Sequence, residues 1–268
     1  MEKIKLSDIN FDALKKLNHQ GTKSTLYDNG DTCIKIFNEL YKEEKVALYK
    51  KFLEMEGIQI NGVLLPIDVI VENDRLEGFT MSNFKNSVPL FDAFTTTRYV
   101  DCAEILKAMK KASLILRKIH KNGIICQDLS FDNILINQEG IINYCDIDSC
   151  TYNERMSPYL SILLKRFMVD YKKMKLCMVS KNLDRVSMLL SFYIVMYLKE
   201  IQKISKKEYH SLSDHIATLE NARKYANMLL SSRNIPEVPY LDELISDFDE
   251  GIIDRQKQIS IVRRIFRR

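Results

Sequence analysis

Strand and helix signals are distributed unevenly along the chain, and this distribution divides it into two unlike parts. Residues 13–37 and 63–81 consist of short apolar runs separated by turn residues, which predicts β-strands. From residue 99 onward the apolar residues recur mostly at helical spacing. A small β-rich part followed by a larger helical part predicts an α+β fold with two lobes, at residues 1–83 and 84–268.

The strongest local signal is a β-hairpin near the N-terminus. Residues 22–27 and 32–37 flank the turn Asp28-Asn29-Gly30-Asp31, and an Asn-Gly step between two strand-like runs favours a tight hairpin. Residues 38–55 then show helical spacing, and Gly57 marks the expected end of that helix. The first lobe is therefore expected to contain a hairpin followed by a helix.

A second strand pair and a long helix are expected further along the chain. Residues 63–71 and 75–81 form the strand pair, and the polar segment at 82–89 would link the two lobes. Residues 101–120 have the spacing of a long amphipathic helix, which Gly123 would end. The change from strands to helices thus falls at the expected linker.

Composition excludes several classes of protein. The chain has only eight glycines, against an average of about 7%, so a glycine-rich phosphate loop would have little besides Gly21. The six cysteines form no CxxC pair and the N-terminus lacks a signal-peptide apolar segment, which predicts a cytoplasmic location. The longest apolar run, residues 186–198, is shorter than the roughly 20 residues of a bilayer span and predicts a buried core helix. A net charge of +4 is too small to imply nucleic acid.

One stretch combines the residue types that phosphoryl transfer requires. Asp128 and Asn133 stand five residues apart in a predicted loop, ahead of a strand pair at residues 134–136 and 141–144. Asp146 follows just beyond the second strand, 18 residues after Asp128. Phosphoryl transfer needs a carboxylate that orients the attacking hydroxyl and oxygen ligands for Mg²⁺. Taken singly, these residues would be ordinary turn residues, but their common register favours the catalytic interpretation.

This arrangement resembles the protein-kinase superfamily, whose catalytic loop reads His-Arg-Asp-Leu-x-x-x-Asn and whose metal motif is Asp-Phe-Gly. The resemblance implies a bilobal protein-kinase-like fold, with ATP and Mg²⁺ held between the lobes. It makes Asp128 the catalytic base, Asn133 a second Mg²⁺ ligand and Asp146 the principal Mg²⁺ ligand. It also implies that Asp184, which opens the predicted core helix, hydrogen-bonds the catalytic-loop backbone.

The same resemblance assigns roles to residues further upstream. Lys35, in a predicted strand, would pair with the α- and β-phosphates of the nucleotide. Glu44 would brace Lys35, with Glu43 as the alternative. The family's glycine-rich loop is matched only by Gly21, with Leu26 in the place of its valine. The remaining nucleotide-binding positions implied by the resemblance are Ser24, Leu26, Cys33, Met81, Ser82, Asn83, Phe84 and Leu135.

Several positions depart from the family pattern. Gln127 replaces the catalytic-loop Arg, so phosphorylation of the following segment would find no matching cation there. Ser130 stands where Ser/Thr-specific kinases carry a Lys, and Asp148 replaces the glycine of the metal motif. Cys126 replaces the loop His, and we expect it to be a small core residue. The resulting Asp-Ile-Asp is similar to divergent bacterial kinase-like proteins.

We therefore expect an ATP- and Mg²⁺-dependent phosphotransferase, with a protein serine/threonine kinase as the first choice. One alternative is a small-molecule phosphotransferase of the aminoglycoside or choline kinase type. The other is a nucleotide-binding pseudokinase that acts as an interaction module, which the reduced glycine loop and Asp148 favour. Residues 255–268 carry six basic side chains. We expect a helix packed on its own lobe there, with contact to an anionic surface as the alternative.

Overall fold

The structure, a computed structural model, contains both α-helices and β-strands, which confirms the α+β class. It describes residues 1–17, 24–38, 40, 42–95, 102–153, 181–203 and 238–245. The chain forms two compact units: the first unit is Met1–Ser87 with Asn143–Asp148, and the second unit is Val88–Ile142 with Ser149–Arg268. The division after Ser87 lies close to the lobe boundary expected at residue 83. Asn143–Asp148 belongs to the first unit, which the sequence did not predict.

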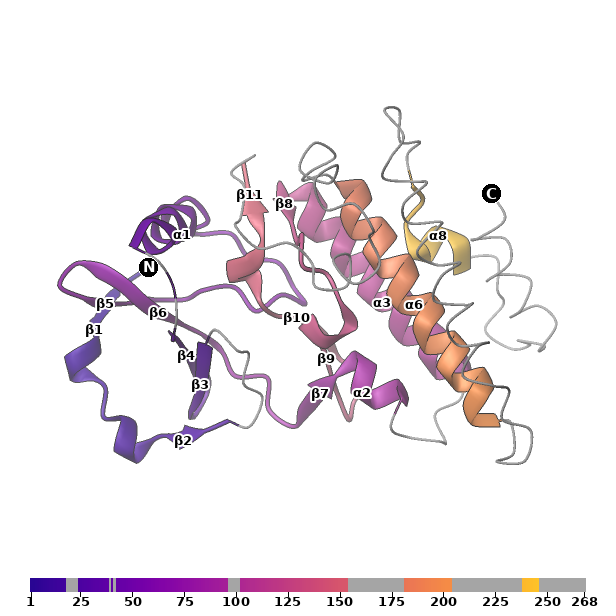
Figure 1. Ribbon diagram of the computed structural model, residues 1–268, viewed down its shortest axis with the longest axis horizontal. Helices are drawn as coiled ribbons and strands as arrows, with labels where there is room; N and C mark the ends of the chain where they lie inside the picture. Colours follow the sequence, from indigo (N-terminus) through magenta and orange to yellow (C-terminus); the bar gives the residue numbers. More distant parts are fainter. Residues whose placement is uncertain are drawn as a thin grey trace. The chain divides into compact units, whose positions relative to one another are not determined.

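A six-stranded sheet forms the body of the first unit, in the order β1-β5-β6-β4-β3-β2 (Figure 1). β1 and β5 run parallel, and the other neighbouring strands are antiparallel. The strands are β1 (Lys3–Lys5), β2 (Lys15–Lys16), β3 (Ser24–Asn29), β4 (Thr32–Phe37), β5 (Val69–Glu72) and β6 (Arg75–Ser82), with short 3₁₀ helices at Leu6–Asp8 and Phe11–Ala13 between β1 and β2.

Both hairpins expected in the first lobe are present in this sheet. Gly30 and Asp31 join β3 to β4, and Gly30 has a φ of 74°, which suits glycine at the first position of a two-residue turn. Asn73 and Asp74 join β5 to β6, with φ of 49° and 59°. Asn and Asp visit this left-handed conformation more readily than most residues do. The turn residues therefore account locally for both chain reversals.

The strand predicted at residues 63–71 is shorter in the structure and is confined to β5. Tyr144 engages the segment before it, because its N–H donates to the Gly62 carbonyl and its own carbonyl accepts from the Leu64 N–H, both at 2.8 Å. Val63 pairs with Tyr144 only as an isolated parallel bridge. The residues before β5 therefore bond to Tyr144, far along the chain, instead of extending β5. The local sequence pattern does not reveal this contact.

The helix of the first unit, α1 (Lys42–Glu54), lies inside the helix predicted at residues 38–55 and packs against β6. Phe52 is fully buried on this contact, and its ring centroid lies 5.1 Å from that of Phe79 in β6. Lys51, the neighbour of Phe52, is only 6% exposed. Lysines are rarely buried unless they are paired, so Lys51 is an unusual residue for this helix face.

β4 and β6 come into close backbone contact at Gly78. A side chain at this position would place its Cβ 2.3 Å from the carbonyl oxygen of Lys35, so only glycine fits. The register of the two strands sets Lys35 opposite Phe79 and Ile36 opposite Gly78. Gly78 therefore allows β6 to pair closely with β4, the strand that carries Lys35.

Two long helices, α3 (Cys102–Lys121) and α6 (Lys181–Lys203), pack together in the second unit (Figure 1). The apolar run at residues 186–198 lies within α6, and its described apolar side chains are buried, as predicted. α3 ends before Gly123, whose φ of 77° is typical of a residue that follows a helix. None of the described helices is both long enough and apolar enough to cross a bilayer.

The remaining elements are short. β8 and β11 form an antiparallel pair, and β9 lies between β10 and β7 in a three-stranded sheet. The Gly140 N–H donates to the Asn137 carbonyl in the turn between the strands predicted at residues 134–136 and 141–144. The elements are α2 (Leu90–Thr95), α8 (Leu241–Ile245), β7 (Ser87–Pro89), β8 (Ile124–Ile125), β9 (Ile134–Asn137), β10 (Ile142–Tyr144) and β11 (Thr151–Tyr152), with 3₁₀ helices at Phe131–Asn133 and Ile147–Ser149.

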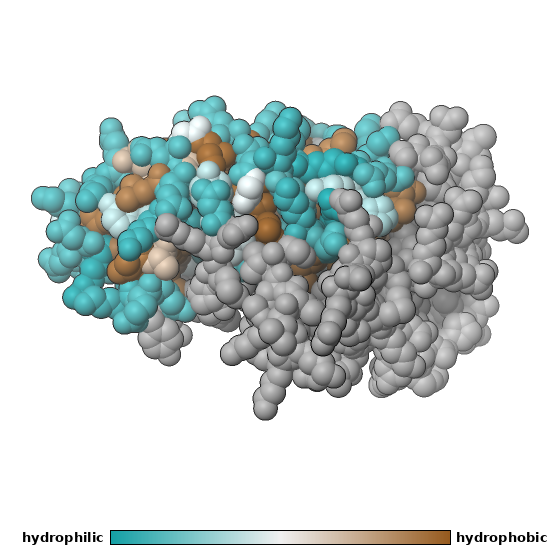
Figure 2. Space-filling model, turned by 90° about the horizontal axis from the view of Figure 1, so that it is seen from above, coloured by the Kyte–Doolittle hydropathy of each residue, from teal (hydrophilic) through white to brown (hydrophobic). Residues whose placement is uncertain are grey.

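The surface of the described residues is mostly polar on the face shown in Figure 2. Hydrophobic residues, coloured brown, occur there in small groups separated by hydrophilic ones. Exposed large apolar side chains occur in both units, for example Val46 and Ile141. Scattered residues of this kind are ordinary at protein surfaces, so they do not identify a docking surface.

Candidate functional site

One cluster of candidate residues surrounds a buried ammonium group in the first unit. Lys35 lies in β4, opposite Leu26 of β3 and Phe79 of β6. Its side chain is 7% exposed, and its Nζ contacts Oδ1 of Asp146 and, at 2.6 Å, Oδ1 of Asp148. One lysine thus joins two carboxylates that follow it by more than 100 residues, and both belong to the turn expected to bind metal.

The two carboxylates sit on a tight turn that leads into the 3₁₀ helix Ile147–Ser149. Asp146 has a φ of 65°, in the left-handed region that few residues other than glycine adopt. Ile147 is 1% exposed and anchors the turn in the core. The side chains of Asp146 and Asp148 are 35% and 12% exposed, so Asp146 is the more accessible of the two.

Burial and charge act in opposite directions on this cluster. Burial lowers the pKa of Lys35, but the two carboxylates outweigh it and hold this pKa above its ordinary value. Burial raises the pKa of Asp146. The Lys35 ammonium lowers this pKa by more, so it stays below its ordinary value. For Asp148, burial and the charge of Asp146 prevail over Lys35, and the pKa is raised. The lysine therefore favours the ionised form of both carboxylates, but its effect prevails over burial only at Asp146.

The candidate residues of the second unit, Asp128 and Asn133, lie in one loop. The Asp128 N–H donates to the Cys126 carbonyl at 2.6 Å, across Gln127, which has a φ of 56°. The side-chain amide of Asn133 donates to the Asp128 carbonyl at 2.8 Å. Phe131, 1% exposed, fixes the loop in the core. The loop thus holds Asp128 and Asn133 together through its own hydrogen bonds.

Asp184 anchors this loop from α6, as the family resemblance implied. Its fully buried carboxylate accepts hydrogen bonds from the Cys126 N–H at 2.7 Å and the Gln127 N–H at 2.9 Å. It also lies 2.9 Å from Nε2 of His120, whose Nδ1 lies 2.8 Å from the Tyr240 hydroxyl. The predicted backbone bonds are confirmed. The histidine and the tyrosine were not predicted.

A larger network of side chains from α3, α6 and α8 surrounds Tyr240. The guanidinium carbons of Arg117 and Arg185 lie 4.1 and 3.9 Å from the centroid of its ring. Arg117 also forms an ion pair with Asp242 of α8 at 2.9 Å, and Ser113 donates to Asp242 at 2.6 Å. Residues at i, i+4 and i+7 share one helix face. That spacing, at residues 113, 117 and 120, is a signal from which this polar face could have been identified.

The predicted nucleotide-binding residues range from buried to exposed. Cys33 and Met81 are paired across β4 and β6, and both are buried. Ser24 is also buried, whereas Leu26 is half-buried and Ser82 is exposed. Gly21 lies outside the described residues. Leu135, in β9 of the second unit, is half-buried, as is Phe84.

Asn83 has a structural role that the sequence interpretation did not include. Its N–H donates to the Asp31 carbonyl at 2.9 Å. Its side-chain amide donates to Oδ1 of Asp28 at 2.8 Å and to the Gly30 carbonyl at 2.9 Å. Asn83 therefore closes the β3–β4 turn, and its N–H is engaged in the fold rather than directed at a ligand.

The two candidates for the partner of Lys35 on α1 differ in exposure. Glu44 is half-buried on the same helix face as Leu48, whereas Glu43 is exposed. In the described part of the chain, the ion pairs of Lys35 are those with Asp146 and Asp148. Bracing of Lys35 by Glu44 therefore stays a prediction.

The cysteines near these residues are largely buried thiols. The register of β8 and β11 sets Thr151 opposite Ile125, so the adjoining residues Cys126 and Cys150 are neighbours. A hydrogen bond with the Cys150 thiol and burial raise the pKa of Cys126. Burial raises the pKa of Cys145 to about 12. A protonated thiol is a poor nucleophile and a poor metal ligand. Cys126 and Cys150 are buried in the core, whereas Cys145 is half-buried.

The donor set fits Mg²⁺ bound together with phosphate. Among the residues that the structure describes, no group of three or more His, Cys, Asp or Glu side chains could hold a metal ion. Asp146 and Asp148 supply two carboxylates that already converge on one cation. Mg²⁺ is usually bound by one or two carboxylates, with phosphate oxygens and water as its other ligands. These residues therefore suit a metal that arrives with a phosphate ligand.

Comparisons with known proteins provide no relative from which a function could be transferred. No family model matches the chain, and no curated protein matches it. A functional assignment therefore depends on the motif residues themselves and on the contacts around Lys35, Asp128 and Asp184.

Proposed function

We propose that this protein is an ATP- and Mg²⁺-dependent phosphotransferase that transfers the γ-phosphoryl group of ATP to a hydroxyl group, with a Ser or Thr side chain as the first candidate acceptor. The observation that carries the proposal is the contact of Lys35 with Asp146 and Asp148. A lysine that binds nucleotide phosphates and an aspartate that binds their Mg²⁺ are neighbouring parts of a phosphoryl-transfer site. Their burial together in one unit supports this pairing of roles.

Each motif residue then has a separate task. Lys35 would bind the α- and β-phosphates as a compact charge on a flexible stem. Asp146 and the amide oxygen of Asn133 would ligate Mg²⁺, which when bound neutralises negative charge on the phosphates. Asp128 would orient the acceptor hydroxyl and take up its proton. Because such catalysis depends mainly on positioning, the hydrogen bonds that the loop backbone donates to the Asp184 carboxylate support it.

The proposal is tested by measuring phosphoryl transfer from ATP with the full chain. ADP release and labelled-phosphate transfer are followed with Mg²⁺, using model proteins that carry Ser and Thr and a panel of amino alcohols as acceptors. We expect transfer by the unmodified chain and a loss of at least about 100-fold in Asp146→Asn, since a lost metal ligand removes several kcal/mol of charge stabilisation. The exposed Asp12 of the same unit provides the control, Asp12→Asn, which should retain full activity.

The outcomes separate the candidate functions. Transfer to amino alcohols but not to proteins would replace the protein-kinase assignment by a small-molecule phosphotransferase, which the serine at position 130 favours. Nucleotide binding with no transfer to any acceptor would indicate a pseudokinase. Equal activity of Asp146→Asn and the unmodified chain would contradict the proposed site.

A further inference from the structure

The turn that carries Asp146 and Asp148 is held by a second buried lysine. Lys51 of α1 is 6% exposed, and its ammonium donates to the Asp148 carbonyl at 2.8 Å and lies 3.4 Å from the Ile147 carbonyl. These acceptors belong to the backbone, whereas Lys35 contacts the carboxylates of the same turn. The turn is therefore bound by one lysine through its side chains and by another through its main chain.

The chemistry of the two attachments differs. The carboxylates that contact Lys35 are the atoms that Mg²⁺ would need, so Lys35 and a metal ion compete for them. The carbonyl groups bound by Lys51 are not those metal ligands. Hydrogen bonds from a charged donor are stronger than neutral ones, and a buried ammonium cannot exchange them for water without cost. The attachment by Lys51 can therefore persist while the partners of Lys35 change.

We propose that Lys51 is a positioning residue, which holds the backbone of residues 146–148 in place while Lys35 leaves the carboxylates for the nucleotide phosphates. This inference rests on the proposed phosphotransferase function. It makes α1 the element that sets the position of the metal-binding turn, because Lys51 lies on the buried face of that helix together with Leu48 and Phe52. A displacement of α1 would then change metal affinity without altering any metal ligand.

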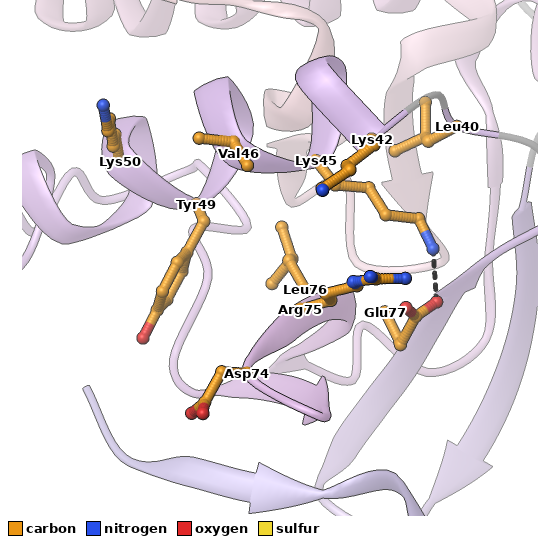
Figure 3. A pocket seen from close by; sticks show the side chains of 10 residues that line it. All are labelled: Leu40, Lys42, Lys45, Val46, Tyr49, Lys50, Asp74, Arg75, Leu76 and Glu77. Atoms are coloured by element: carbon orange, nitrogen blue, oxygen red, sulfur yellow. Dashed lines mark hydrogen bonds and ion pairs between the residues drawn. The ribbon is translucent and has the colours of Figure 1, made fainter.

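The other lysines of α1 provide matched controls. Lys42, Lys45 and Lys50 line a groove between α1 and the β5–β6 hairpin, with Lys45 paired to Glu77 (Figure 3). Lys50 is exposed and directly precedes Lys51 in the chain. Lys50→Met therefore removes the same charge from the same helix and leaves the 146–148 turn untouched.

The test compares Lys51→Met, Lys51→Arg and Lys50→Met by hydrogen exchange of the full chain. Lys51→Met keeps an unbranched side chain of similar length in the core but donates no hydrogen bond. We expect the amides of residues 146–149 to exchange at least about tenfold faster in Lys51→Met, as the loss of a charge-assisted bond implies. Amides of β4 and β6 should keep their rates. Lys51→Arg should restore most of the protection, and Lys50→Met should match the unmodified chain.

A kinetic measurement adds a second readout. In Lys51→Met, the Mg²⁺ concentration for half-maximal turnover should rise about tenfold, whereas the KM for ATP at saturating Mg²⁺ should change less than about twofold. A purely structural lysine would raise exchange throughout the sheet and would shift both constants together, and that result would overturn the proposal. Unchanged exchange at residues 146–149 would also overturn it, whether or not the chain turns over ATP. Absence of turnover in the unmodified chain would instead contradict the proposed function.

Discussion

Among the described residues, Asp146 and Asp148 in the first unit and Asp184 in the second unit each lie in a buried polar cluster. The carboxylates of these two clusters are satisfied in opposite ways. In the first unit, Asp146 and Asp148 face the full positive charge of Lys35. In the second unit, Asp184 is surrounded by two backbone N–H groups and the ring of His120. One cluster is balanced by a charged side chain, and the other is balanced largely by the main chain of the loop that it holds.

Because of this difference, the carboxylates of the first cluster can exchange their partner, whereas the carboxylate of the second cluster cannot. The ammonium of Lys35 is carried on a flexible four-carbon stem and can move from a carboxylate to a phosphate. The N–H groups of Cys126 and Gln127 cannot leave Asp184 unless the loop itself unfolds. The first cluster is therefore suited to binding a ligand, and the second is suited to holding Asp128 in one position.

The largest effect is expected from removal of the fixed cluster. Asp184→Ala would leave two buried N–H groups and a buried histidine without their acceptor. Loss of one partner from such a buried charged network costs about 3–5 kcal/mol of stability. Urea unfolding of the full chain measures this loss. Glu104→Ala, at an exposed position of α3, is the control and should change stability by less than about 0.5 kcal/mol.

A smaller and pH-dependent loss is expected from the exchangeable cluster. Lys35→Met leaves two carboxylates facing each other, and because Asp146 is one-third exposed we expect a cost of about 2–3 kcal/mol near neutral pH. The raised pKa of Lys35 means that its stabilisation is complete below its unfolded pKa of about 10.4 and is lost as pH rises further. At the acid end, the lowered pKa of Asp146 means that its contribution is lost as pH falls below about 3.9.

The stability difference between the unmodified chain and Lys35→Met should therefore be largest between about pH 5 and pH 10 and should shrink on either side. Urea unfolding of both proteins at about pH 3, 7 and 11 measures this profile. A difference that is constant across this range would show that Lys35 acts through packing rather than through its charge.

A single hydrogen bond tests how the fixed cluster is assembled. Tyr240→Phe removes the hydroxyl that contacts His120 but keeps the ring between Arg117 and Arg185. We expect a loss of about 1 kcal/mol in urea unfolding, which is typical of one buried hydrogen bond. Tyr152→Phe, at a half-buried tyrosine, is the matched control and should be close to neutral. A loss well above 2 kcal/mol would mean that the hydroxyl supports Asp184 through the histidine.

The last prediction concerns the reactivity of two cysteines in the first unit and involves no change of sequence. Burial raises the pKa of Cys33 to about 11 and that of Cys145 to about 12. At pH 8 both thiols should react with iodoacetamide at least about 100-fold more slowly in the folded chain than in urea. Peptide mass spectrometry measures the labelling of each cysteine. Rapid labelling of Cys145 in the folded chain would show that the turn before Asp146 opens readily.

Local residue patterns predicted much of the secondary structure. The turn at Gly30, the long helices α3 and α6 and the hairpin around Gly140 all follow from neighbouring residues. The spacing and the family resemblance also singled out Asp128 and Asn133, whose catalytic roles stay predictions, and the resemblance singled out Asp184. The hydrogen bonds that Asp184 was expected to form with the loop backbone are confirmed.

Contacts between distant segments were not predictable in this way. Tyr144 displaces the expected strand before β5, and Asn83 uses its N–H to close a turn. Lys51 gives no sign in the sequence that it differs from Lys50, yet only one of them is buried. Nor did the spacing show that Asp148 would share Lys35 with Asp146.

The division between the two kinds of result has a physical cause. Turns and helices depend on φ preferences and on side chains a few residues apart, so the sequence by itself determined them. The charge state and the partners of a buried lysine depend on which carboxylates and carbonyl groups the folded chain brings beside it. Only the tertiary structure decided that Lys35 would contact the carboxylates of the Asp-Ile-Asp turn and that Lys51 would hold its backbone.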